Sequence, residues 1–331
     1  MRAAGAGSLK LTWFVTVEMA AICSVHPNPA IMIRIVVMGD FTLSRTIRVI
    51  KPAGREKVPD FLARLERLRE AGFSVFYDET PEEASWSYAS GSISDRAREL
   101  NLALKSSSPD VLLAARGGYG SSDLLELVEW ESLKGVPEKT IVGFSDISAL
   151  LSAVYTRLGW RGIHAPMPGS SLWEWGPDVT VLLDVLKGQK TELPFEVTAL
   201  KDAHSDISGE LFGGCFSVLT SLIGTPFFPS SLSGKILFLE DIGENPGRLM
   251  RFWNQWIQSG ATRGIQGVLL GHFSGVGEPS ENQCQIFFDE FAKRADVPVW
   301  QTSAFGHKQE NYPMPIGAAI RIHGSTAKWT L

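Results

Sequence analysis

The sequence predicts an α/β fold, with an N-terminal parallel-sheet domain of the Rossmann or flavodoxin-like kind and a smaller C-terminal α+β domain. Two observations carry this prediction. The chain has 331 residues, of which 44% are hydrophobic and 20% charged, enough to bury two cores. From about residue 46, short apolar runs alternate with segments of helical periodicity, which is typical of βαβ units with parallel strands.

The elements of the first half follow one another at regular spacing. The run TIRVIKPAG at 46–54 is rich in β-branched residues and ends in a turn, which indicates a buried strand. Residues 58–72 place apolar side chains on one helical face, and Gly72 ends that helix. The elements expected next are strand 73–78, helix 93–105, strand 110–118, a helix from about 122, strand 140–144 and helix 146–159.

The pattern changes after about residue 170. The segments 168–178 and 199–210 are polar or rich in Gly and Pro, and they bracket one helical segment, which suggests a connection between domains. Beyond it we expect strands at 235–241, 267–273, 297–302 and 318–324 and helices at 246–259 and 283–294. The expected division is an irregular extension over 1–45, an N-terminal α/β domain over 46–170, a connecting segment over 171–205 and a C-terminal domain over 206–331.

The N-terminal extension does not fit the alternating pattern. Residues 11–25 are mostly apolar, like the core of an export signal, but Glu18 interrupts them and they are too short to span a membrane. No small-x-small cleavage site stands out. We interpret the segment as irregular, with Met32 or Met38 as a reasonable start, and expect a cytoplasmic protein; an export signal is the alternative.

Charge and cysteine content exclude several classes of partner. There are 31 Lys and Arg against 36 Asp and Glu, a net charge of −5, and no long basic run, which argues against nucleic acid or a membrane surface as partner. The three cysteines are widely separated, which suits a reducing compartment without a disulfide framework. No His, Cys, Asp or Glu group has metal-ligand spacing, so we expect no metal and no cofactor.

Ser145 lies where an apolar strand turns into a helix. Such a serine can project its hydroxyl above the sheet as a nucleophile, with the N–H of Asp146 on one side of an oxyanion hole. The alternative is an ordinary helix N-cap. Local spacing favours the cap, because the usual hydrolase turn has glycine two residues after the serine and this chain has Ile147.

A second motif, RGGYG at 116–120, follows the preceding strand. Carboxyl ends of neighbouring parallel strands meet at one edge, so this loop and Ser145 should face each other across a crevice. The loop lacks the Lys-Ser/Thr of a P-loop and the third glycine of a dinucleotide fingerprint. It either turns N–H groups toward a reacting carbonyl or is a purely structural turn.

A serine nucleophile needs a base and a carboxylate. Of the six histidines, His307 lies in a polar loop between strands, whereas His164 and His272 end apolar strands and are expected to be packed or hydrogen-bonded in place. Glu240 ends the apolar run KILFLED, so a carboxylate is delivered at a strand terminus, where an ion pair or a turn cap is the ordinary alternative.

Taken together, these motifs resemble the LD-carboxypeptidase family of serine peptidases, which includes the microcin C self-immunity peptidases. The resemblance runs from about residue 46 to the C-terminus. It rests on six ordered blocks: RGGYG, GFSDISALL, HAPM, GGCFSVLTSLIGTP, LFLEDIGENPGRLMR and GHKQENYPMPIG. It implies an active site between the two domains.

The resemblance also implies roles for individual residues. Ser145 would be the nucleophile, His307 the general base and Glu240 the acid that orients it, the last two in the C-terminal domain. The N–H groups of Asp146 and of the turn at Gly118 would bind the oxyanion. The candidates for substrate binding are Arg116, Gly117, Tyr119, Trp173, Trp175 and Asn311.

The chain departs from the family pattern at three positions outside this triad. Cys215 stands where the family usually has the asparagine of Gly-Gly-Asn, Phe144 replaces a common tyrosine, and Ala165 replaces a glycine. Cys215 puts the hydrogen bonding near the ELFGG segment in question.

The implied activity is cleavage of an L,D bond that releases terminal D-alanine from murein tetrapeptide in cytoplasmic cell-wall recycling, by a homodimer. The alternative substrates are peptidyl or aminoacyl nucleotides, as in the microcin-type relatives, and the GGYG form of the loop favours murein. A non-enzymatic protein that binds a small ligand in the same crevice is a further alternative. A Rossmann-type oxidoreductase is weaker, because its glycine fingerprint and acidic residue are missing after the first strand.

Overall fold

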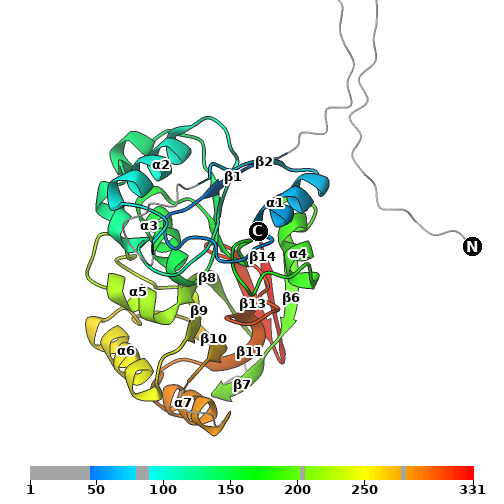
Figure 1. The fold of residues 1–331 in the computed structure, drawn as a ribbon. Coiled ribbons are helices and arrows are strands. Elements are labelled where there is room, and N and C mark those ends of the chain that lie inside the picture. The colour runs from blue at the N-terminus through cyan, green and yellow to red at the C-terminus, as the bar shows by residue number, and fades with distance from the viewer. Residues whose placement is uncertain (1–44, 80–88, 202–205, 277–280) are drawn as a thin grey trace, which may run out of the picture. The chain divides into compact units, whose positions relative to one another are not determined.

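The computed structural model describes residues 45–331 except 80–88, 202–205 and 277–280 (Figure 1). The extension predicted over 1–45 therefore lies, apart from Arg45, outside the described residues. The described chain holds a sheet of mostly parallel strands and a second, mixed sheet, which confirms the predicted α/β fold class.

The first sheet has six strands in the order β12-β5-β4-β3-β1-β2. All neighbouring pairs are parallel except β12 with β5. Every residue of β3 is buried, as expected for a strand covered on both faces. The strands are β1 Thr46–Ile50, β2 Ser74–Phe76, β3 Val111–Ala114, β4 Thr140–Val142, β5 Gly162–His164 and β12 Met314–Pro315.

The helices of this half are α1 Phe61–Glu70, α2 Ile93–Lys105 and α3 Ser148–Leu158. The helix predicted from about residue 122 is present as two short 3-10 helices, Ser122–Leu127 and Trp130–Leu133. Side chains donate to carbonyl groups that would accept backbone N–H groups in a longer helix. The indole of Trp130 donates to Leu125 O, and the side-chain amide of Asn101 donates to Leu127 O.

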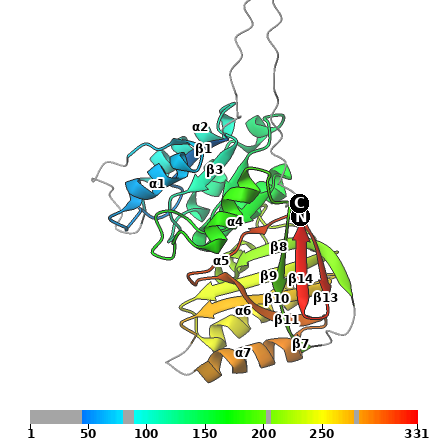
Figure 2. The same ribbon diagram turned by 90° about the vertical axis from the view of Figure 1, so that its right-hand side faces the viewer.

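The second sheet has eight strands in the order β6-β14-β13-β8-β9-β10-β11-β7. Its centre, β8 to β11, is parallel, and the outer pairs are antiparallel. Figure 2 shows α6 and α7 along one side of this sheet. The strands are β6 Glu192–Glu196, β7 Thr198–Lys201, β8 Ile207–Cys215, β9 Lys235–Ile242, β10 Gly267–Ser274, β11 Val299–Gly306, β13 Ala319–His323 and β14 Thr326–Thr330, and the helices are α5 Phe216–Leu222, α6 Pro246–Ser259 and α7 Glu281–Arg294.

Two segments tie the halves together. The stretch predicted as a connection contains α4 (Pro177–Leu186) and then β6 and β7, which form the two edges of the second sheet. In return, β12 from the C-terminal half pairs with β5 in the first sheet. No helix in the part of the chain that the structure describes has the length and apolarity needed to cross a bilayer.

Candidate active site

Ser145 has a backbone conformation shared by no other non-glycine residue among those described. Its φ is 61°, in the left-handed region, directly after β4. The extended residue Phe144 occupies the N-cap position, and no side-chain hydrogen bond caps the turn. The serine is therefore not a helix cap. Strained residues of this kind cost about 1–3 kcal/mol and cluster at functional sites.

The turn around Ser145 depends on two glycines that come before it. A Cβ at Gly143 would lie 2.9 Å from Ile147 Cγ2, and a Cβ at Gly117 would lie 3.0 Å from Ser145 Cβ. Gly143 is the first glycine of the generic Gly-x-Ser-x-Gly pattern, and Ile147, which stands where the second glycine would be, packs directly against it.

The RGGYG loop is fixed beside this turn, as the strand order predicts. Ser121 donates its N–H to Asp146 Oδ2 at 2.9 Å and its hydroxyl to Asp146 O at 2.5 Å. The buried guanidinium of Arg96 donates to Gly120 O at 2.7 Å. Gly118 has φ +114°, which only glycine adopts readily. Burial raises the pKa of Asp146, and the Ser121 N–H offsets part of that rise.

Glu240 and His307 form a buried hydrogen-bonded pair. Glu240 lies near the carboxyl end of β9 and His307 follows β11, the strand on the far side of β10. Nδ1 of His307 is 2.5 Å from Glu240 Oε2, and their side chains are 7% and 0% exposed. The His307 ring lies 5.0 Å from that of Phe144, so the pair reaches the turn that carries Ser145.

The charges of this pair support each other. Burial alone raises the pKa of Glu240, but His307 and His164 more than offset it and hold that pKa at about 2. Burial alone lowers the pKa of His307, and the Glu240 carboxylate outweighs this and raises it above its ordinary value. The carboxylate is therefore ionised throughout the neutral range.

His164 contacts the same carboxylate, which the sequence did not reveal. Its Nε2 lies 3.3 Å from Glu240 Oε1, and both side chains are fully buried. The expectation that this histidine is hydrogen-bonded in place is confirmed. The available signal was its position at the end of β5, next to the strand that precedes Ser145.

Cys215 makes its main contact through the backbone. Its N–H donates to Ser148 Oγ at 2.9 Å, so the residue type does not alter this bond. Its thiol faces Asp241, 3.5 Å from Oδ1, and burial followed by the nearby carboxylates raises the thiol pKa well above its usual range. Burial and then the charge of Glu240 raise the pKa of Asp241 to about 6.

The substrate-binding candidates fall into two groups. Tyr119 is 71% exposed on the loop beside Ser145. The guanidinium of Arg116 donates to Arg55 O at 3.2 Å, so it helps to hold this loop, in which Gly117 packs against Ser145.

The other candidates are packed into the structure. Trp173 is 1% exposed, its ring is 5.7 Å from that of Trp175, and Arg67 lies over the latter at 4.2 Å. Asn311 is 1% exposed, and its Oδ1 accepts the N–H of Gly306 at 3.0 Å, directly before His307. This hydrogen bond shapes the loop that holds His307.

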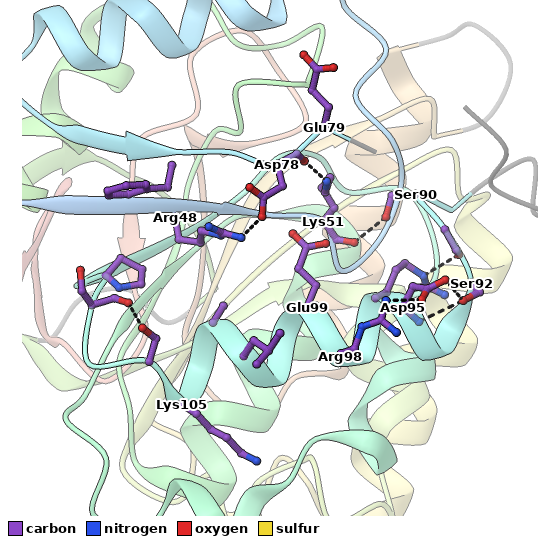
Figure 3. A pocket seen from close by; sticks show the side chains of 18 residues that line it. Arg48, Lys51, Asp78, Glu79, Ser90, Ser92, Asp95, Arg98, Glu99 and Lys105 are labelled. Carbon is purple, nitrogen blue, oxygen red and sulfur yellow. Dashed lines mark hydrogen bonds and ion pairs between the residues drawn. The ribbon is translucent and has the colours of Figure 1, made fainter. Parts of the chain in front are cut away.

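A cavity of about 1120 Å³ lies away from these residues. It is bounded by β1, β2 and α2, and Figure 3 shows Arg48, Asp78, Lys51 and Glu99 grouped in it. None of the predicted site residues lines it. Among the described residues no group of three or more His, Cys, Asp or Glu could hold a metal ion.

Comparisons with known proteins identify the family. Residues 47–165 match the model of the LD-carboxypeptidase N-terminal domain, and residues 208–322 match that of its C-terminal domain. A murein tetrapeptide carboxypeptidase of Pseudomonas aeruginosa is 31% identical over 294 residues, which cover 86% of this chain and 94% of the relative. A putative carboxypeptidase of Streptomyces coelicolor is 30% identical over 308 residues, which cover 86% and 92%.

Solved structures show the same fold. The crystal structure of an MccF-like protein from Bacillus anthracis matches with a TM-score of 0.75 at 24% identity, covering 87% of this chain and 97% of that one. A muramoyltetrapeptide carboxypeptidase from Oxalobacter formigenes matches with a TM-score of 0.74 at 24% identity, covering 86% and 99%. With both domain models matched in order over most of its length, the chain belongs to the LD-carboxypeptidase family of serine peptidases.

Proposed function

We propose that this peptidase is a serine carboxypeptidase that cleaves an L,D peptide bond and releases terminal D-alanine from murein tetrapeptide. The observation that carries the proposal is the strained Ser145 directly after β4, next to Phe144, whose ring lies 5.0 Å from that of His307 in the buried His307–Glu240 pair. The murein tetrapeptide carboxypeptidase of Pseudomonas aeruginosa supports the substrate class.

The proton path follows from the hydrogen bond between the pair. His307 donates its Nδ1–H to Glu240, which leaves Nε2 unprotonated as the base for the Ser145 hydroxyl. The serine oxygen attacks the carbonyl carbon, and the proton moves to Nε2. When the C–N bond breaks, Nε2 returns this proton to the amine of D-alanine, and an ester on Ser145 remains. Water then attacks the ester by the same proton transfers and frees the serine.

The oxyanion would be held by two backbone N–H groups. The first N–H groups of a helix have no intrahelical partner, and that of Asp146 stands directly after the nucleophile. The second donor is the N–H of Gly118, in the loop that Ser121 and Arg96 hold beside the turn. Loss of one such donor costs about 3 kcal/mol of transition-state stabilisation.

The test is turnover of murein tetrapeptide followed by mass spectrometry. Wild-type protein should yield tripeptide and D-alanine, and a serine-reactive phosphonate should label Ser145. The Ser145→Ala variant should do neither. Retained D-alanine release by that variant would contradict the serine mechanism, and an unlabelled, inactive wild type would favour the non-enzymatic ligand-binding alternative.

The alternative substrates are peptidyl or aminoacyl nucleotides. The observation that favours them is the exposed ring of Tyr119 beside the nucleophile, because an exposed aromatic face can stack on a base. Trp173 and Trp175 are packed and offer no such face. A competition assay between murein tetrapeptide and an aminoacyl sulfamoyl adenosine separates the two, and Tyr119→Ala should weaken only a nucleotide substrate.

A cytoplasmic location, a role in wall recycling and a homodimeric state belong to the same proposal. Cell fractionation checks the location, accumulation of tetrapeptide in a deletion strain checks the role, and light scattering of the purified protein checks the oligomeric state.

A further inference from the structure

Glu240 has a histidine on each of its carboxylate oxygens. His307 Nδ1 lies 2.5 Å from Oε2, and His164 Nε2 lies 3.3 Å from Oε1. The catalytic proposal uses only the first. The second histidine comes from β5 in the first sheet, whereas Glu240 lies on β9 in the second, so this contact joins the two sheets behind the nucleophile.

His164 is enclosed in a way that excludes it as the base. Its side chain is fully buried, and its ring meets the edges or faces of Phe144, Phe238 and Phe305 at centroid distances of 5.7, 5.6 and 6.4 Å. Nδ1 has no hydrogen-bond partner among the described residues. A proton on Nδ1 would be buried without an acceptor, so the ring is neutral and carries its proton on Nε2, where the carboxylate accepts it.

We propose that His164 is a positioning residue, which holds the Glu240 carboxylate in the rotation that aims Oε2 at His307. The inference rests on the proposed function, since it assigns His164 a part in the Ser145–His307–Glu240 relay.

The reason is mechanical. The terminal torsion of a glutamate is broad, so a single hydrogen bond on Oε2 leaves the carboxylate plane free to rotate. A second donor on Oε1 fixes that plane, and the aromatic rings fix the donor. Because the donor is neutral, the full negative charge of Glu240 remains available to stabilise the imidazolium that forms during attack.

The same contact affects the pH dependence of the base. The groups around the relay are Asp241 beside Glu240 on β9, Cys215 at the end of β8, His272 on β10 and Lys308 after His307. None of these donates to Oε1. Removing the Nε2–H of His164 therefore withdraws the donor that fixes the carboxylate plane, so Oε2 turns away from His307 and raises the pKa of His307 less.

The experiment compares three variants with wild type on murein tetrapeptide across pH. His164→Leu removes the donor, His164→Gln keeps an N–H donor of similar reach, and Phe238→Leu disturbs the same packing without touching the hydrogen bond. For His164→Leu we expect kcat to fall by up to about a hundredfold, the cost of a 1 Å misplacement, with KM unchanged. The acidic limb of kcat/KM should move to lower pH, because the misaimed carboxylate raises the pKa of His307 less. His164→Gln should recover most of the rate, and Phe238→Leu should leave the limb in place.

An active wild type together with a His164→Leu variant that keeps both kcat and the acidic limb would overturn the inference. So would a shift of the limb in Phe238→Leu of the same size as in His164→Leu. If His164→Leu does not fold, NMR of ring nitrogens in the wild-type protein decides: the inference requires a neutral His164 with its proton on Nε2 at neutral pH, and a proton on Nδ1 would contradict it. A wild type that neither turns over tetrapeptide nor reacts with phosphonate defeats the proposed function instead.

Discussion

The left-handed conformation of Ser145 predicts that the nucleophile destabilises the fold. At φ 61° a residue with a Cβ is strained by about 1–2 kcal/mol, whereas glycine is not. Glycine loses about 0.5–1 kcal/mol more in backbone entropy on folding. Since no side-chain hydrogen bond is lost at this turn, Ser145→Ala should be nearly neutral, and Ser145→Gly should raise the free energy of unfolding by about 0.5–1 kcal/mol above Ser145→Ala.

The assay is urea or thermal unfolding of both inactive variants, where the difference amounts to about 2 °C in Tm. Gly159 is a matched control, because it has φ +70° with nothing within 4 Å of an added Cβ. Gly159→Ala should therefore lower the free energy of unfolding by about the amount by which Ser145→Gly exceeds Ser145→Ala. A Ser145→Gly variant less stable than Ser145→Ala, with Gly159→Ala destabilised as expected, would refute the claim of strain at the nucleophile.

Four further predictions concern the His307–Glu240 pair, the turn at Ser145 and the substrate. Glu240 raises the pKa of His307 above 6.5 despite the burial of the ring, and His307 must be neutral to act as the base. The value of kcat/KM should therefore fall as the pH drops through that raised pKa, and Glu240→Gln should move this acidic limb of the profile to lower pH. The free energy of unfolding should respond in the opposite sense at neutral pH. The His307–Glu240 ion pair contributes in full between about pH 4.5 and 6.5, and its contribution is lost as the pH rises through the pKa of His307. It is also lost as the pH falls from 4.5 through the pKa of Glu240 at about 2, and unfolding measured as a function of pH checks both losses. Gly117→Ala should retain its circular dichroism but lose up to about a hundredfold in kcat, because the new Cβ would lie 3.0 Å from Ser145 Cβ, and an unchanged kcat would show that the turn yields. Chelators should leave the rate unchanged, and a tetrapeptide ending in L-alanine should be cut at least about a hundredfold more slowly than the D form; equal rates would argue against an LD-carboxypeptidase.

The sequence allowed the prediction of features that are local along the chain. Apolar runs and helix stops located most strands and helices, and the ends of the strands located Ser145 and Glu240. The edge strands β6 and β7 were missed, because both are short and mostly exposed or half-buried, and β6 alternates but carries Pro194 at its centre. Trp173 was a candidate for substrate binding, but sequence motifs do not tell whether a ring faces outward or packs, and this ring is 1% exposed.

Contacts between distant segments were outside the reach of such patterns. His164 and Glu240 are 76 residues apart in sequence and belong to different sheets, so no periodicity relates them. The glycines that permit the sharp turn at Ser145 were likewise hidden, since Gly117 reaches the serine from the loop after β3 and Gly143 makes room for Ile147. Only the order of several motifs together, compared with a family, pointed to the site.

In the proposed mechanism, the contacts between the two sheets matter for catalysis. Ser145 follows β4 in the first sheet, whereas Glu240 lies on β9 and His307 follows β11 in the second, so a movement of one sheet against the other changes the distance between Ser145 and His307. Two contacts oppose such movement behind the turn: His164 to Glu240, and the Cys215 N–H to Ser148 Oγ. The second contact also needs a glycine at position 214, because a Cβ there would lie 2.5 Å from Ser148 Oγ. If the proposed mechanism holds, these residues help to set the distance over which the proton passes from Ser145 to His307 without themselves meeting the substrate.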